Sequence, residues 1–226
     1  MIGAVAAGLT VAGLAAHGTW HRNSWIFGPV LNRLPSADVS ITFDDGPNPD
    51  ATPVILDVLR RENVKATFFV LGRHADRWPA LVKRMADEGH QIGNHGYFHR
   101  KLHRRTPGYV RDDLTRGVDA IERACGVRPR VFRAPHGFRN PWVTPIARSL
   151  GERTIGWSLG VWDSARPGAD EIVKRTLAGM RDGSILLLHD GDGYDASGDR
   201  MQTAEALPRI IDGLRGRGFR FAILPD

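Results

Sequence analysis

Two adjacent carboxylates, Asp44 and Asp45, follow a short apolar run and precede a Gly-Pro pair at 46–47. Neighbouring carboxylates repel one another, so keeping them together costs free energy unless the chemistry uses both. If 39–43 is a buried strand, the two side chains leave its end on opposite sides and Gly-Pro turns the chain at once. One carboxylate can then bind a metal while the other moves a proton. The bland alternative is a surface turn that caps the next helix.

Two histidines, His95 and His99, lie four residues apart further along the chain. On a helical turn this spacing puts both imidazoles on one side, where they can bind one cation. With Asp45 they form a set of two imidazoles and one carboxylate, which leaves positions for water and substrate and suits Zn²⁺, Fe²⁺, Co²⁺ or Ni²⁺. Without the Asp pair, two exposed or core histidines would be the better interpretation. Residues 101–105, including His103, are expected to form a solvated basic loop.

Three further polar residues follow predicted strands. His189 ends the apolar run 184–188, where partial burial and nearby carboxylates can give it a pKa useful for acid catalysis. A histidine that only caps the strand is the alternative. Arg133 precedes a rigid turn at 134–137 and can orient a carboxylate. Asp163 follows the next predicted strand.

The elements that must position these residues alternate in type. From residue 39 onward, short apolar or β-branched runs alternate with amphipathic segments, which is the pattern of βα units. The predicted strands are 39–43, 66–71, 91–94, 130–133, 153–157, 184–188 and 219–223. The predicted helices are 52–62, 79–88, 107–125, 141–150, 169–181 and 202–217. Seven such units predict a barrel-like α/β fold, in which the loops after the strands meet at one mouth.

Length and charge restrict the functional classes. The chain has 226 residues, enough for one domain with a sizeable core, and its formal net charge is +6. The arginines are scattered instead of forming a run, so nucleic-acid binding is not expected, whereas an anionic cell-envelope surface is compatible. The single Cys125 excludes an internal disulfide and is expected to be a buried structural thiol.

The N-terminal part differs from the rest. Residues 2–16 carry no charge and are rich in small residues, but a membrane-spanning helix needs about 20 apolar residues and a signal peptide needs a basic start. We interpret 2–16 as a membrane anchor or partial signal, with a packed Ala/Gly-rich helix as the alternative. The polar and aromatic connector 17–37 can pack on the barrel or lie at a membrane interface. The expected division is 1–38, anchor and connector, and 39–226, catalytic domain.

Three stretches together resemble one known family. Thr42–Pro47, Ala66–Val70 and Leu186–Asp190 are similar to the polysaccharide deacetylases, carbohydrate esterases of family 4 that share the deacetylase domain of nodulation proteins. The resemblance covers roughly 25–225. It implies a distorted, TIM-barrel-like (β/α)7 barrel in a single domain. It also implies one divalent metal, Zn²⁺ before Co²⁺, Ni²⁺ or Fe²⁺, and removal of acetyl groups from N-acetylated sugars.

The resemblance also assigns roles. It implies that Asp44 is the general base and His189 the general acid. The implied metal ligands are Asp45, His95 and His99. Arg133 orients the base, and we expect Asp163 to pair with Arg133, which would keep that base ionised.

The resemblance also implies two substrate contacts, and the sequence departs from the family pattern at three places. Leu187 forms a wall for the acetyl methyl group, and the backbone N–H of His136 is an oxyanion donor although His replaces the usual aromatic. Gly96 stands where Ser or Thr is usual, so a hydrogen bond that steadies the metal loop is expected to be missing. The fourth motif keeps Asp163 and has Trp162 at a shifted position.

The predicted function is therefore metal-dependent N-deacetylation of a polysaccharide or cell-envelope glycan. Alternatives are an O-acetyl ester or small-amide substrate on the same scaffold, or a glycan-binding member without turnover. Trp142, Trp157 and Trp162 can stack on sugar rings, although core packing is the better interpretation for Trp157. The predicted location is the cell envelope, with membrane association through 2–16.

Overall fold

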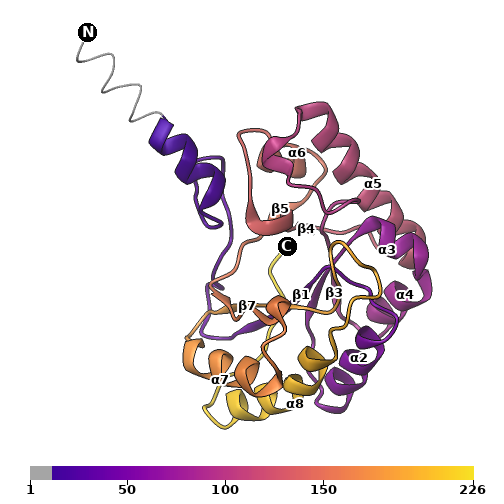
Figure 1. Ribbon diagram of the computed structural model, residues 1–226, viewed down its shortest axis with the longest axis vertical. Coiled ribbons are helices and arrows are strands. Elements are labelled where there is room, and N and C mark those ends of the chain that lie inside the picture. Colours follow the sequence, from indigo (N-terminus) through magenta and orange to yellow (C-terminus); the bar gives the residue numbers. More distant parts are fainter. Residues whose placement is uncertain (1–11) are drawn as a thin grey trace.

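The computed structural model describes residues 12–226, and seven parallel strands form its single sheet, in the order β5-β4-β3-β2-β1-β7-β6. The sheet curls into a half-barrel with helices around its outside (Figure 1). The strands are β1 Ser40–Asp44, β2 Thr67–Val70, β3 Gln91–Asn94, β4 Val131–Phe132, β5 Arg153–Thr154, β6 Leu159–Gly160 and β7 Ile185–His189. The predicted (β/α)7 fold is confirmed.

The helices begin and end where the sequence provides the signals. They are α2 Ala51–Arg61, α3 Gly72–Arg77, α4 Pro79–Asp87, α5 Pro107–Cys125, α6 Val143–Ser149, α7 Ala169–Gly179 and α8 Met201–Arg215. Proline opens α4 and α5, and the Thr106 side chain caps α5 by accepting a hydrogen bond from the backbone of Tyr109. Gly126, with a φ of 74°, ends α5. Of these seven helices, only the short α3 was not predicted.

Alternation along β1 decides what reaches the mouth. Ile41 and Phe43 are fully buried among the outer helices, in the main hydrophobic core with Ile55 of α2. Burying one such side chain stabilises the fold by about 1.5–3 kcal/mol. Because successive side chains alternate, Thr42 and Asp44 point to the inside of the barrel. Asp44 is the last residue of the strand and therefore lies at its carboxyl end.

Two strand predictions were wrong. The predicted strand 153–157 is observed only as the two-residue β5, which pairs with β4. The next strand, β6, begins after the predicted range and pairs with β7 near the other edge of the sheet. The predicted strand 219–223 is only a bridge between Val39 and Phe221. Beyond that bridge the Gln91 side chain bonds the backbone of Leu224 in place of a neighbouring strand.

The N-terminal connector lies against the barrel. A helix at 12–20 projects from the barrel and leads into it (Figure 1). Leu31 bridges Ile155 and Arg33 bridges Ser184, so the connector spans the opening between the two ends of the sheet. In the part of the chain that the structure describes, no helix is long and apolar enough to cross a membrane. The anchor predicted at 2–16 lies largely outside the described residues, and its role, the domain boundary at 38/39 and the cell-envelope location stay predictions.

Candidate functional site

A cavity of about 620 Å³ opens at the carboxyl ends of the strands. The expected convergence of the loops is confirmed, because residues at or after every strand except β2 line it. The predicted site residues that line this cavity are Asp44, Asp45, His95, His99, His136, Trp162, Asp163, Leu187 and His189. The remaining one, Arg133, is fully buried and bonds to Asp44.

The predicted metal ligands form a compact buried triad. Asp45 Oδ1 lies 3.1 Å from His99 Nε2 and 3.3 Å from His95 Nε2. His95 Nδ1 lies 2.8 Å from the Arg133 carbonyl, so we assign its proton to Nδ1, which leaves Nε2 as a lone pair facing Asp45. Asp45 Oδ1 has no hydrogen-bond partner among residues 12–226. Two imidazoles and an orphaned carboxylate oxygen fit a divalent transition-metal ion.

Electrostatics favour the metal-binding forms of Asp45 and His99, the ionised carboxylate and the neutral imidazole. Burial lowers the pKa of His99 to about 3, so this imidazole is neutral at physiological pH. Burial raises the pKa of Asp45, whereas His99 and His95 lower it. The lowering is larger, so the pKa of Asp45 lies below its ordinary value. The pKa of His95 is raised overall: burial lowers it, and Asp44 and Asp45 more than offset that effect. The carboxylate is therefore ionised.

A non-helical loop brings the two histidines together. The loop after β3 has left-handed residues at Gly96 (φ 75°) and His99 (φ 57°), so the predicted helical turn was wrong. Asp113 of α5 accepts hydrogen bonds from the backbone of Tyr97 (3.1 Å) and Phe98 (3.2 Å). A Cβ at Gly96 would lie 2.5 Å from Asp113 Oδ2. The carboxylate of Asp113 thus fills the space that a larger residue at 96 would need. It also supplies hydrogen bonds to the metal loop, for which the sequence analysis expected a missing hydrogen bond.

The two adjacent carboxylates do not diverge as alternating strand residues would. Asp45 follows the strand end with a left-handed φ of 72°. Asp44 Oδ2 consequently lies 3.7 Å from His95 Nε2, the same nitrogen that Asp45 approaches. Both carboxylates approach His95 Nε2, Asp45 at 3.3 Å and Asp44 at 3.7 Å. The predicted orientation to opposite sides was therefore wrong.

Arg133 fixes Asp44 from below the cavity. Its Nη1 donates to Asp44 Oδ1 and to Thr42 Oγ1, both at 2.7 Å, and its Nη2 donates to the Gly156 carbonyl at 2.9 Å. The guanidinium also lies over the ring of Phe69, 4.1 Å from its centroid. A fully buried cation is tolerated because these partners compensate its desolvation. The predicted contact between Arg133 and Asp44 is confirmed.

Asp163 has a different partner from the one we expected. Its Oδ1 lies 2.9 Å from His189 Nδ1, and its Oδ2 accepts hydrogen bonds from His189 N (2.7 Å) and Thr203 Oγ1 (3.1 Å). No contact with Arg133 forms among the described residues, because Asp163 is fully occupied by His189 and Thr203. The carboxylate orients the histidine, so the predicted Asp163–Arg133 pair was wrong.

His189 is poised to hold a proton. Burial lowers the pKa of His189, but Asp163 and, to a lesser extent, Asp45 and Asp44 raise it to about 9. Its side chain is 16% exposed. Since Nδ1 bonds Asp163, Nε2 is the nitrogen that remains available to the cavity.

The wall of the cavity combines apolar and polar groups. Leu187 is 9% exposed and Trp162 is 74% exposed. The backbone N–H of His136 has no acceptor in the described part of the chain, and its ring Nε2 lies 3.1 Å from Tyr194 Oη. Trp157 lines the cavity instead of being confined to the core, and the Arg22 guanidinium covers its ring at 5.3 Å from the centroid.

Comparison with known proteins identifies the family. The sequence pattern named "Polysaccharide deacetylase" matches residues 32–155, more than half of the chain. The chain belongs to the polysaccharide deacetylase family. Its predicted class, a hydrolase of carbon–nitrogen bonds other than peptide bonds, is confirmed at the level of this family. Members of the family are in general metal-dependent, which agrees with the triad.

Individual relatives span most of the domain. A chitooligosaccharide deacetylase of Bradyrhizobium sp. (strain ANU 289) is 43% identical over 195 residues, covering 83% of this chain and 89% of the relative. A solved peptidoglycan N-acetylglucosamine deacetylase, in complex with a benzamide compound, has a TM-score of 0.80 and 35% identity, covering 87% of this chain and 90% of that one. A solved pseudoenzyme of carbohydrate esterase family 4 from Bacillus anthracis has a TM-score of 0.77 and 28% identity. The match covers 85% of this chain and 66% of the pseudoenzyme chain.

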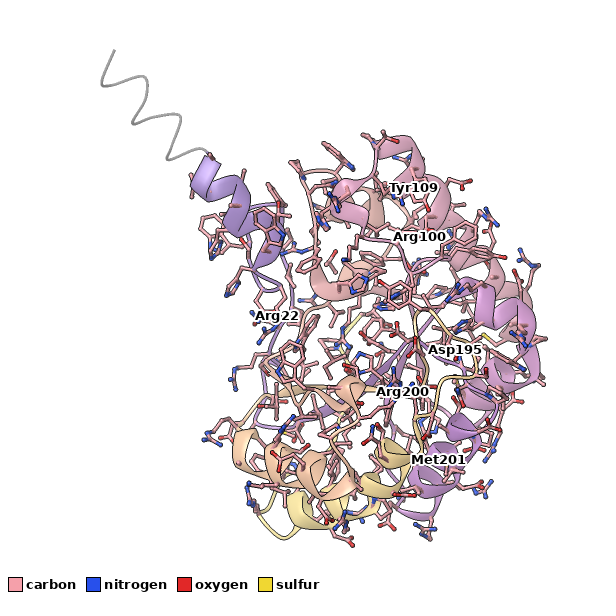
Figure 2. All side chains as sticks on the ribbon, viewed as in Figure 1. Arg22, Arg100, Tyr109, Asp195, Arg200 and Met201 are labelled. Carbon is pink, nitrogen blue, oxygen red and sulfur yellow. The ribbon has the colours of Figure 1, made fainter. Side chains whose placement is uncertain are left out.

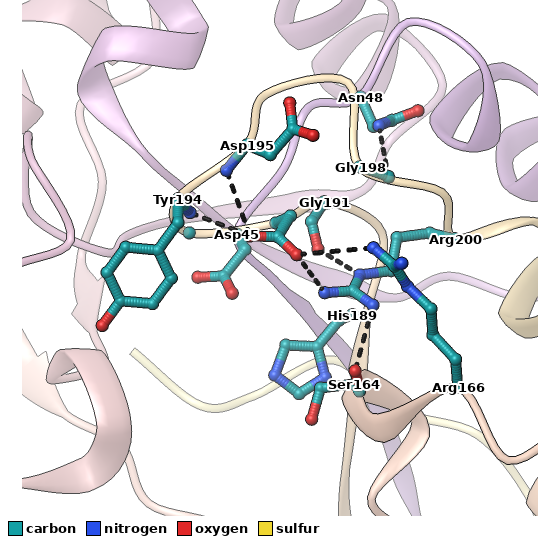
Figure 3. A network of polar contacts seen from close by, with 12 residues as sticks. Asp45, Asn48, Ser164, Arg166, His189, Gly191, Tyr194, Asp195, Gly198 and Arg200 are labelled. Atoms are coloured by element: carbon teal, nitrogen blue, oxygen red, sulfur yellow. Dashed lines mark hydrogen bonds and ion pairs between the residues drawn. The ribbon is translucent and has the colours of Figure 1, made fainter.

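Sequence reasoning missed the loop after β7. Figure 3 shows the polar contacts of this loop, several of them made by Arg200. Arg200 is 3% exposed, and it donates to Gly191 O at 2.7 Å and to Asp192 Oδ2 at 2.8 Å. The other oxygen of Asp192 accepts hydrogen bonds from the backbone of Tyr194 and Asp195. This arrangement fixes Tyr194 at the mouth. The Asp- and Gly-rich sequence of the loop indicates turns, but it does not indicate that the loop lines the site of a polysaccharide deacetylase.

Proposed function

We propose that this chain removes acetyl groups from N-acetylated sugar residues of a glycan, with one divalent metal, Zn²⁺ by preference, at Asp45, His95 and His99. The observation that carries the proposal is the pairing of two proton-handling units on one cavity. Asp44, paired with Arg133, lies against the triad, and His189, paired with Asp163, lines the same cavity. When bound, the metal would supply Lewis-acid activation of the carbonyl and of the attacking water.

Asp44 is the proposed general base. Arg133 holds its Oδ1 at 2.7 Å, so Oδ2 is the oxygen left to accept a proton from water. That oxygen lies next to the triad, 3.7 Å from His95 Nε2, which is where water must be activated. The Arg133–Asp44 ion pair, at 2.7 Å, holds this carboxylate in place at the edge of the triad.

His189 is the proposed general acid. An amine is a poor leaving group at neutral pH, so cleavage of an amide requires that its nitrogen be protonated. A pKa of about 9 keeps His189 protonated in this range, and Nε2 faces the cavity. The free N–H of His136 would stabilise the oxyanion, and Leu187 would contact the acetyl methyl group. A histidine with a raised pKa favours an amide over an O-acetyl ester, whose leaving group needs less protonation.

Acetate release tests the proposal. The wild-type chain should release acetate from N-acetylglucosamine oligomers, lose this activity with a chelator and regain it with Zn²⁺. His189→Ala should keep its bound metal and lose far more activity on the amide than on an activated acetyl ester. Equal losses on the two substrates would contradict the acid role, and acetate release by a rigorously metal-free preparation would contradict the metal.

A further inference from the structure

A second, smaller cavity of about 200 Å³ adjoins the mouth and is strongly cationic. The residues that line it are His99, Arg100, Lys101, Arg104, Arg105 and Tyr194. His99, Lys101 and Tyr194 also line the large cavity, so the two cavities share a wall. Figure 2 shows Arg100 on the same side of the barrel as Tyr109 of α5. A group bound in the small cavity would therefore sit beside a sugar at the catalytic centre.

The four cations of this small cavity are not neutralised by the protein. None of them forms an ion pair or a side-chain hydrogen bond with another residue between 12 and 226, whereas Arg84 and Arg123 elsewhere on the surface pair with aspartates. The Arg105 guanidinium lies over the ring of Tyr109, 4.9 Å from its centroid. Burial lowers the pKa of the nearby His103, and the positive charges of Arg104 and Lys101 lower it further. Like charges gathered in this way favour an anion.

The backbone that carries these cations is anchored. Leu102 is fully buried, and its carbonyl accepts a hydrogen bond from Asn140 Nδ2 at 3.1 Å. The Arg105 carbonyl accepts one from Trp142 Nε1 at 3.0 Å. The loop is thus fixed at both ends of its short 3₁₀ turn, Leu102–Arg104, and its cationic residues line the cavity. A preorganised cationic site loses less entropy on binding than a mobile one.

Resting on the deacetylase function proposed above, we propose that the small cavity binds a carboxylate of the glycan, on the sugar next to the one that loses its acetyl group. The preferred substrate is then an acidic glycan instead of a neutral oligomer. Guanidinium groups suit a carboxylate because they can donate two parallel hydrogen bonds to it. Cations at the mouth also attract an anionic substrate before it binds.

A matched pair of substrates tests this preference. One is an N-acetylated tetrasaccharide whose alternate sugars carry a carboxylate, and the other is the same compound with each carboxylate converted to a carboxamide. We expect the wild type to show a kcat/KM about fivefold or more higher for the carboxylate compound at 50 mM NaCl, on the scale of one or two exposed ion pairs. About 0.5 M NaCl should largely remove the difference, because salt screens exposed charges.

Variants locate the effect. Arg104→Gln with Arg105→Gln should bring the ratio of the two kcat/KM values close to one. Arg148→Gln with Arg153→Gln removes the same charge from exposed positions outside both cavities and should retain the wild-type ratio. Equal kcat/KM values for the two compounds with the wild type, or loss of the preference in the control pair, would overturn the carboxylate site. Failure of the wild type to release acetate from either compound would instead overturn the deacetylase function.

Discussion

Replacement of Asp163 by Asn tests whether its carboxylate sets the protonation of His189. The charge of Asp163 makes the largest contribution to raising the pKa of His189 from 6.5 to about 9. Without that charge the pKa should fall toward 6.5, a change of about 2.5 that corresponds to about 3 kcal/mol. A general acid works only while protonated, so activity is lost as the pH rises through its pKa. The alkaline limb of kcat/KM should therefore move to lower pH in Asp163→Asn.

The size of the effect depends on pH. At pH 8, a pKa of about 9 leaves about nine-tenths of His189 protonated, and a pKa of 6.5 leaves about 3%. The variant should thus be roughly thirtyfold slower than the wild type on an amide at pH 8, and much closer to it below pH 6.

The assay is acetate release from an N-acetylglucosamine oligomer between pH 5.5 and 10 at fixed Zn²⁺. Thr203→Val is the matched control, because it removes a hydrogen bond to Asp163 Oδ2 and keeps the charge. Its alkaline limb should stay near that of the wild type. An Asp163→Asn profile that is lowered equally at every pH would refute the reasoning and leave Asp163 a structural residue.

Two other predictions concern the supports of the site. Asp113→Ala should weaken metal binding by about 10- to 100-fold, the usual range for groups that orient metal ligands. The reason is that the backbone N–H groups of Tyr97 and Phe98 lose their acceptor. Titration with Zn²⁺ measures the affinity, and an unchanged affinity would show that the loop needs no such hydrogen bond. A chain that starts at residue 12 should remain folded and active in acetate release. The reason is that the contacts between connector and barrel are made by residues such as Asn23, Leu31 and Arg33, which this chain keeps. Aggregation in mild buffer would count against the anchor interpretation of 2–16.

The parts of the site carried by strand ends could be predicted from the sequence. Asp44 ends a strand of alternating apolar and hydroxyl residues and His189 ends a continuous apolar one, so their position at the mouth follows from the strand pattern and the parallel sheet. The candidate metal ligands were chosen from residue type, from the spacing of His95 and His99 and from the family resemblance, and the structure brings the three together.

Contacts between distant elements could not be predicted in the same way. The support of the metal loop by Asp113 depends on how α5 is rotated against the sheet, which periodicity defines only approximately. The partner of Asp163 is decided by which of two buried groups its backbone position reaches, and His189 is the nearer. The wall that Trp20 and Arg22 contribute depends on the path of an irregular connector, for which the sequence has no periodic signal.

The division of labour between Asp44 and Asp45 tests the central claim most directly. Bound metal and acetate release should be measured together for Asp44→Asn and Asp45→Asn. We expect Asp44→Asn to retain its metal and to lose about 10²-fold or more in kcat, the usual effect of removing a general base. Asp45→Asn should lose metal first and recover part of its activity at high Zn²⁺. Loss of metal by Asp44→Asn and its retention by Asp45→Asn would show that the roles are reversed, and full activity of both variants would contradict the proposed catalytic site.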